Sequence, residues 1–261
     1  MNLEELNALI LRKQIDKNVP IILPVGSMEV HGTHLPFGTD VFIVQAICML
    51  ISQRENVIVM PPVWYSLTDT TNELCGTINI PQQVIYKYIK SICLSLVENK
   101  FFRIIVLSIH GRNNLFLPAV VSEVFQETNL PIVYIDPYTC FAKDLDESIL
   151  GRMHNHKKET TLLLASLKLL NLEARVNLSE TEIKVEKPSF LKELLSVGSV
   201  GYFYNKDIEH ISPQEGVSIE DGIKYLNKVA ERIISLFGKI TEYKHYIDQN
   251  PRNKKGYSPT K

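Results

Sequence analysis

Four side chains of types that bind metal ions lie within one short segment of the sequence. Glu29, His31, His34 and Asp40 all fall in residues 26–40, a stretch interrupted by glycine and proline. Glu29 and His31 are two residues apart, so in an extended chain they project to the same side. Carboxylates and imidazoles together suit Zn²⁺, Mn²⁺ or Fe²⁺. Residue types and spacing therefore predict a divalent-metal site in this segment.

Each of these residues also has an ordinary structural interpretation. Asp40 stands directly before an apolar run and could serve as a helix N-cap. A single histidine in a loop, such as His34, is more often structural than a ligand. Glu29 taken alone would be a surface acid. The concentration of all four residues favours the metal site, while the N-cap alternative for Asp40 stays open.

Two later segments contain further ligand types. His110 lies in residues 108–114, directly after an expected strand. His154 and Glu159 lie in residues 153–161, at the expected start of a helix. An acid in the first turn of a helix is also favoured by the helix dipole alone. The two histidines that stand near Glu159 favour a functional interpretation.

The elements that must position these residues alternate along the chain. Strands are expected at short β-branched runs and helices at longer amphipathic stretches. The expected strands are residues 21–25, 57–60, 104–107 and 132–135, and the expected helices are residues 40–53, 81–99, 115–128, 158–170 and 218–237. This alternation predicts an α/β fold with a mostly parallel sheet flanked by helices on both faces. The segments after the strands would then share the carboxyl edge of the sheet, where sites form.

We expect one domain over residues 1–261. Residues 179–216 are irregular in pattern, with one short helix near residues 190–195. Tyr202, Phe203, Tyr204 and His210 in this stretch either pack together or line a pocket or a subunit contact. From about residue 239 the chain turns polar and then basic, which predicts a solvated or loosely ordered tail.

Composition and charge exclude several classes of function. The formal net charge of −1 argues against a nucleic-acid partner. The longest apolar run, residues 41–51, is too short to span a membrane. Acids precede the apolar patch near the N-terminus, which is the reverse of a secretory signal. The four cysteines form no C-x-x-C pair and are expected to be reduced. We therefore expect a cytoplasmic protein.

The segment Glu29-x-His31-Gly32-x-His34-Leu35-Pro36-x-Gly38-Thr39-Asp40 resembles the signature of the creatininase (creatinine amidohydrolase) family. Three further segments agree in order and spacing. Ser108-Ile109-His110-Gly111-Arg112-Asn113 is similar to the family's Asn-Gly-His-Gly-Gly-Asn. His154 with Glu159-Thr160-Thr161 resembles its His-Ala-Gly-x-x-Glu-Thr-Ser. Pro61-Pro62-Val63-Trp64-Tyr65 with Gly76-Thr77-Ile78 resembles its Pro-Pro…Pro-Gly-Thr-Ile stretch.

The resemblance implies a hydrolase of a C–N amide bond with two divalent metal ions (Zn, Mn or Fe) in each subunit. Asp40 would bridge the ions, Glu29 and His110 would complete one site, and His31 and Glu159 the other. A hydroxide between the ions would attack the amide carbon. His154 would protonate the leaving nitrogen. A homo-oligomer, often a hexamer, is also implied.

Departures from the family pattern bear on the substrate. Creatinine-specific members carry a glutamate where this chain has Arg112, which argues against creatinine. Those members also use tryptophans around the substrate, and Trp64 is the only tryptophan here. Arg112 suggests a carboxylate or phosphate on the substrate, because its planar fork suits such groups, although it could equally point into solvent. Arg112, His34 and Trp64 are the candidates for contacting the substrate.

Several functions stay open at this point. A cyclic amide, a formamide or a small peptide-like molecule would each suit the predicted centre. A degenerate family member would bind metal and ligand without turnover. A C–N bond-forming enzyme of a specialised pathway is the third possibility.

Overall fold

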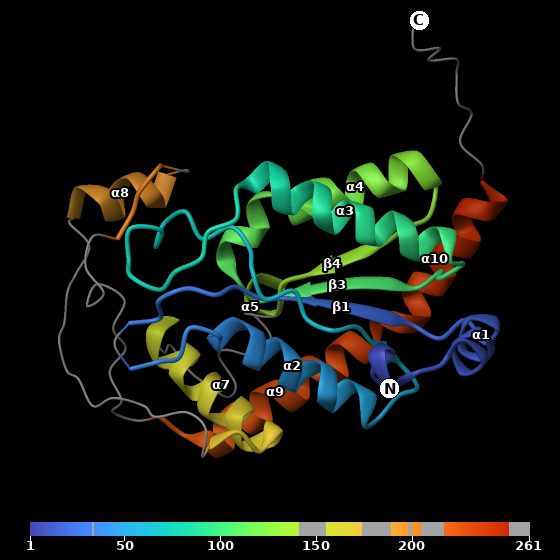
Figure 1. Cartoon of the computed structure of the whole chain (residues 1–261), viewed down its shortest axis with the longest axis horizontal. Coiled ribbons are helices and arrows are strands. Elements are labelled where there is room, and N and C mark those ends of the chain that lie inside the picture. Colours follow the sequence, from blue (N-terminus) through green and yellow to red (C-terminus); the bar gives the residue numbers. More distant parts are fainter. Residues whose placement is uncertain (33, 141–154, 174–188, 198–199, 205–216, 251–261) are drawn as a thin grey trace, which may run out of the picture.

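A parallel four-stranded sheet lies at the centre of the computed structural model (Figure 1). The structure describes residues 1–250 except residues 33, 141–154, 174–188, 198–199 and 205–216. The strand order is β2 (Ile58–Val59), β1 (Ile21–Val25), β3 (Ile104–Ser108) and β4 (Val133–Ile135). All three neighbouring pairs are parallel, so every strand ends at the same edge of the sheet.

Helices cover both faces of this sheet, which confirms the predicted fold class (Figure 1). One face is covered by α2 (Thr39–Ser52), α7 (Asn155–Leu170) and α9 (Ile219–Ile234), and the other by α3 (Gln82–Glu98) and α4 (Leu117–Thr128). Side chains alternate along each strand, so Ile22 packs into the first core and Ile21 into the second. The strands read as continuous apolar runs because both of their faces are buried.

Six further elements complete the described chain. They are η1 (Leu3–Glu5), α1 (Ala8–Asp16), η2 (Gly111–Leu115), α5 (Pro137–Cys140), α8 (Ser189–Val197) and α10 (Leu236–Gln249). The side-chain hydroxyl of Ser218 accepts from the amide of Asp221 at 3.1 Å, so α9 begins at the cap that the sequence predicts. In the part of the chain that the structure describes, no helix is both long and apolar enough to cross a membrane.

The C-terminal part differs from the expected tail. The chain is helical up to Gln249, where a solvated or loosely ordered segment was predicted from about residue 239. Phe237, Ile240 and Ile247 are buried on one side of α10, and the first two join the core beneath α9. These few apolar residues are spaced along one helical face, and the surrounding polar residues hide that pattern in the sequence.

Candidate metal centre

Three of the predicted ligands come from the loop after β1 and the first turn of α2. Glu29, His31 and Asp40 are all buried, and each offers one ligand atom within 4.8 Å of the others. The segment is held close to the helix because Gly26 has no side chain. A Cβ at that position would lie 2.4 Å from Cγ2 of Val41. The close contact between strand end and helix start keeps Asp40 beside the loop.

His110 joins this group from the neighbouring strand. Val25 at the end of β1 is in register with Ser108 at the end of β3, so the residues that follow lie at one edge. Nδ1 of His110 is 2.9 Å from Oε1 of Glu29 and 2.9 Å from Oδ2 of Asp40. The parallel sheet thus brings together residues that are far apart in the sequence.

Glu159 reaches the same place from the first turns of α7. Its Oε1 lies 3.7 Å from Nε2 of His31. Helix α7 packs tightly on α9, where a Cβ on Gly222 would lie 2.6 Å from the carbonyl oxygen of Thr161. This close helix contact sets the position of Glu159.

The five side chains form two groups that share one carboxylate. Oδ2 of Asp40 faces Nδ1 of His110, which also contacts Glu29, while Oδ1 of Asp40 lies 3.6 Å from Nε2 of His31. His31 in turn faces Glu159. Each group contains one imidazole, one glutamate and one oxygen of Asp40. A carboxylate placed in this way can bridge two cations about 3.5 Å apart.

Backbone carbonyl groups orient both imidazoles. Nε2 of His110 lies 2.7 Å from the carbonyl oxygen of Leu67, and Nδ1 of His31 lies 3.0 Å from that of Glu29. A carbonyl oxygen can only accept, so these ring nitrogens donate. The other nitrogen of each ring faces the carboxylates, and its lone pair would bind a cation there. In many metal sites a hydrogen bond to the outer ring nitrogen fixes the tautomer in this way.

Two hydroxyl groups orient the carboxylates. Ser27 donates to Oδ2 of Asp40 at 2.6 Å, and Thr71 donates to Oε2 of Glu29 at 2.6 Å. Asp40 lies inside the first turn of α2, and Gly38 occupies the N-cap position. The N-cap alternative for Asp40 is therefore wrong, because its side chain faces the cluster.

The imidazoles and carboxylates of the cluster shift one another's pKa values. Burial raises the pKa of Glu159 to about 7, against the opposing charge of His31. Burial would lower the pKa of His31, but the carboxylates of Glu159 and Asp40 outweigh it and raise the value to about 10. Burial would also raise the pKa of Asp40, but His31 and His110 hold it well below its usual value. Two buried carboxylates, the partly exposed carboxylate of Glu159 and two histidines make a donor set that fits divalent cations.

The other predicted site residues lie around this cluster in different ways. His34 is buried, and its Nε2 is 3.2 Å from the hydroxyl of Thr160, next to Glu159. Arg112 donates two hydrogen bonds of 2.6 Å to Asp69. The structure thus gives Arg112 a protein partner, so neither solvent nor substrate is needed to explain its position. His154 lies outside the described residues.

Trp64 lies away from the five clustered residues. It packs edge-on against Phe42 at 5.9 Å between ring centroids. It also lines an apolar cavity of about 580 Å³ between the end of β2 and helix α3, and none of the five clustered residues lines this cavity. A contact between Trp64 and the substrate stays a prediction.

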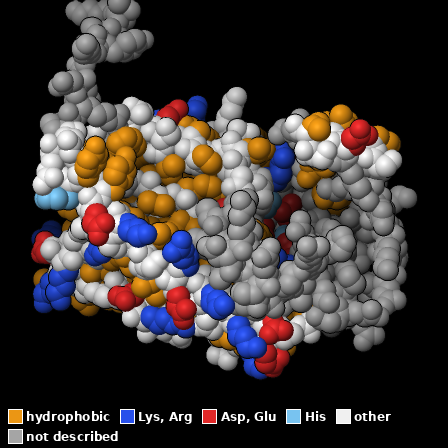
Figure 2. All heavy atoms as spheres, turned by 180° about the vertical axis from the view of Figure 1, so that it is seen from behind, with side chains coloured by type: hydrophobic (Ala, Val, Ile, Leu, Met, Phe, Trp, Pro, Cys, Tyr) orange, Lys and Arg blue, Asp and Glu red, His pale blue; other side chains and the backbone are white. Residues whose placement is uncertain are grey.

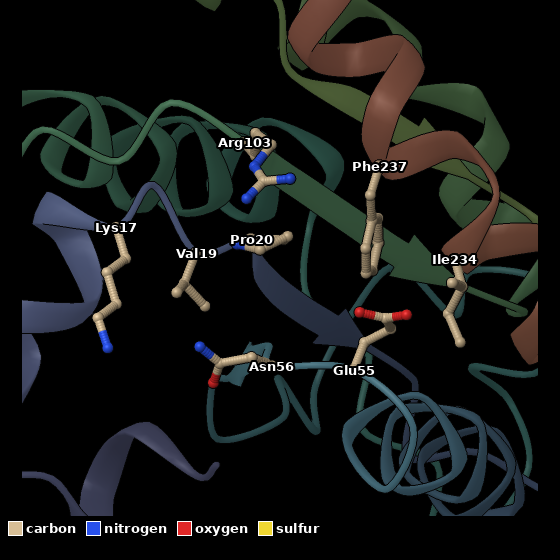
Figure 3. Close-up of a pocket in the computed structure, with 8 residues that line it drawn as sticks. All are labelled: Lys17, Val19, Pro20, Glu55, Asn56, Arg103, Ile234 and Phe237. Carbon is tan, nitrogen blue, oxygen red and sulfur yellow. The ribbon is translucent and has the colours of Figure 1, made fainter.

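Another cavity lies at the opposite edge of the sheet, near the amino ends of β1 and β3. It has a volume of about 290 Å³, and Figure 3 shows its lining residues, which include Lys17, Glu55 and Arg103. Nε of Arg103 donates to the carbonyl oxygen of Asn18 at 2.8 Å, which ties two loops together. None of the predicted ligands lines this cavity.

Several residues of the site carry no signal in the sequence. Ser27 lies inside the first motif, but Thr71 and Leu67 belong to a loop without recognisable spacing. Lys158 is buried, with its Nζ 4.9 Å from the ring centroid of Tyr138. Burial and the negative charges of Glu159 and Asp40 raise the pKa of Tyr138 well above its usual value. The hydroxyl of Tyr138 is buried without a hydrogen-bond partner in the described structure, and can donate to a ligand.

The cluster lies on the side of the molecule where the loop after β1, the start of α7 and helix α8 gather (Figure 1). Seen from behind, charged side chains show inside a hollow on this side, next to α8 (Figure 2). The site is therefore at the carboxyl edge of the sheet, as the alternation of strands and helices predicts.

Comparison with known proteins agrees with this architecture. Creatinine amidohydrolase of Pseudomonas putida is 25% identical over 164 residues, which are 56% of this chain and 63% of that protein. The 3-dehydro-scyllo-inosose hydrolase of Thermotoga maritima is 24% identical over 127 residues, 48% of this chain and 40% of that protein. The matched part thus covers less than two thirds of either relative.

A solved creatininase mutant complexed with creatine has the same fold. Its TM-score is 0.70 at 18% identity, with 96% of this chain and 99% of that chain covered. The model of the creatininase family, described as creatinine amidohydrolase, matches residues 4–237. The family model covers most of the chain and the solved structure has the same fold, so this chain belongs to the creatininase family.

Proposed function

We propose that this protein hydrolyses a C–N amide bond of a small molecule at a centre of two divalent metal ions. The observation that carries the proposal is the position of Asp40, whose two oxygens face two separate pairs of ligands. Glu29 and His110 would hold one ion, and His31 and Glu159 the other. Ions bound there would lower the pKa of a water molecule towards neutrality and stabilise the charge that develops on the amide oxygen.

Zinc, manganese and iron all suit this donor set. Solved creatininases of the same fold include a manganese form and a zinc–zinc form, which supports divalent ions here. His154 would protonate the leaving nitrogen, as the resemblance implies. Creatinine is not the proposed substrate, because Arg112 replaces a family glutamate and pairs with Asp69. Cyclic amides, formamides and small peptide-like amides are the proposed classes.

The proposal is tested by metal analysis followed by an amide substrate panel. Protein loaded in turn with Zn²⁺, Mn²⁺ and Fe²⁺ is incubated with cyclic, formylated and peptide-like amides, and amide cleavage is measured. We expect two metal equivalents in each subunit and cleavage of one class. Protein that binds no transition metal would contradict the metal centre.

Metal binding without any hydrolysis would instead favour the degenerate member of the family, for which the altered second and third motifs are the supporting observation. Formation of a C–N bond from an activated acyl donor would favour the synthetic alternative. The predicted cytoplasmic location and the homo-oligomer, possibly a hexamer, stay predictions. Light scattering on the metal-loaded protein measures the oligomer directly.

A further inference from the structure

The loop of residues 66–71 contacts both halves of one proposed metal site. The carbonyl oxygen of Leu67 accepts from His110, and the hydroxyl of Thr71 donates to Glu29. These two contacts orient the imidazole and the carboxylate that would hold the same ion. A displacement of the loop would therefore disturb both ligands together.

Three contacts join this loop to the segment that carries His110. The Leu67–His110 hydrogen bond is the first. The hydroxyl of Ser66 donates to the side chain of Asn113, and Arg112 pairs with Asp69. The Arg112 pair is bidentate, with both bonds at 2.6 Å, and such a fork restrains orientation as well as distance. Asp69 is the most exposed residue of the loop.

The Arg112 pair is also partly open to water. The side chain of Asp69 is 44% exposed and that of Arg112 is 25% exposed. Pairs of this kind contribute little to global stability, so removing one leaves the fold intact. Any consequence of its removal should be local to the loop.

We propose that Arg112 and Asp69 form a latch that holds the 66–71 loop against the proposed metal site, with Arg112 acting as a positioning residue for His110 and Glu29. This inference rests on the proposed metal centre. It gives a role to the arginine that replaces the family's glutamate: the side chain steadies the ligands from outside instead of binding the metal or the substrate. Arg112 could bind an anionic substrate only if its pair with Asp69 opened.

Metal affinity tests the latch without any need for a substrate. Zn²⁺ affinity is measured by competition with a chromophoric chelator in the wild type, Asp69→Asn and Arg112→Ala. Loss of a residue that hydrogen-bonds a metal ligand typically lowers metal affinity by about 10- to 100-fold. Arg112 and Asp69 act on the ligands through the loop, so loss of their pair should lower the affinity by about tenfold. Hydrogen exchange at the amides of Thr68 and Thr71 should become faster in both variants. The double variant should be no weaker than either single variant, because the two residues act as a unit.

Two controls separate a latch from a general charge effect. Lys90→Gln removes the exposed pair between α3 and α4, where Lys90 contacts Glu123 at 2.7 Å, and should change neither readout. The swapped double variant Asp69→Arg/Arg112→Asp restores the pair in reverse and should recover part of the lost affinity.

Two results would overturn the latch while leaving the metal centre in place. One is unchanged Zn²⁺ affinity and exchange in Asp69→Asn and Arg112→Ala, when the wild type binds zinc. The other is a loss confined to turnover of carboxylate- or phosphate-bearing amides, which would make Arg112 a specificity residue. A wild type that binds no metal overturns the proposed function first, and the latch with it.

Discussion

His110 lies 2.9 Å from Asp40, measured from Nδ1 to Oδ2, although the two residues follow different strands of the sheet. The second oxygen of Asp40 faces His31. This arrangement makes Asp40 common to both groups of candidate ligands.

Asp40→Asn should abolish binding of both metal ions and all hydrolysis together. Asparagine keeps the shape of the side chain but removes the charge that two cations would share. Metal content and amide cleavage are measured on the same preparation. Asp248→Asn, which changes an exposed acid of α10, is the matched control and should retain both. Loss of one ion with the other still tightly bound would contradict the bridging role.

Glu159→Gln should make the metal-free protein more stable than the wild type above neutral pH. The pKa of Glu159 is raised from its usual value to about 7, so folded protein holds this proton more tightly than unfolded protein. The contribution of Glu159 to stability therefore falls as the pH rises from about 4.5 through 7. The glutamine variant avoids this loss, which is on the order of 3 kcal/mol.

The measurement is urea unfolding at pH 5 and pH 8 in the presence of chelator. The two proteins should be similar at pH 5 and diverge at pH 8. With metal present the order should reverse, because the variant lacks a ligand. If the free energies of unfolding of the two proteins differ by the same amount at both pH values, burial does not raise the pKa of Glu159 in the metal-free protein.

His154→Ala should retain metal and lose turnover by about 10²- to 10⁴-fold, the usual contribution of an acid–base residue. Metal content, kcat and the pH dependence of kcat are measured. The limb of the pH profile that reports the titration of His154 should disappear in the variant. His245→Ala, on the exposed side of α10, is the control. Loss of metal in His154→Ala would instead make this histidine a ligand.

Gly222→Ala should destabilise the protein by about 1–3 kcal/mol, as over-packing usually does. The new methyl group would lie 2.6 Å from the carbonyl oxygen of Thr161 and force α7 away from α9. Since Glu159 precedes Thr161 by two residues on α7, metal affinity should weaken as well. Thermal unfolding and zinc competition measure the two effects.

Gly238→Ala is the matched control for that substitution. A Cβ at Gly238 meets no atom within 4 Å, and the residue lies in helix α10. Alanine is the better helix former, so this variant should gain roughly 0.5–1 kcal/mol and leave metal affinity unchanged. Equal effects of the two substitutions would remove the packing argument for Gly222.

Much of the fold could be predicted from the sequence because its signals are local. The strand at β1 and the helices α2, α3 and α7 all lie within a few residues of their expected bounds. Buried β-branched runs, apolar periodicity and the Ser218 cap depend only on neighbouring residues. The sequence does not predict helix α10, because Phe237 and Ile240 show their role only where they pack into the core beneath α9.

The amino-acid sequence by itself determined the types of the candidate ligands, their order and the edge of the sheet at which they gather. Parallel strands end on one side, and that topological rule needs no coordinates. Only the tertiary structure decided which oxygen of Asp40 faces which histidine. It also decided that Thr71 and Leu67 contact the candidate ligands and that Arg112 pairs with Asp69 of the same loop. The contacts of Thr71, Leu67 and Asp69 join positions more than forty residues apart in the sequence. They are made by an irregular loop, and the periodicity of a sequence does not predict how such a loop folds.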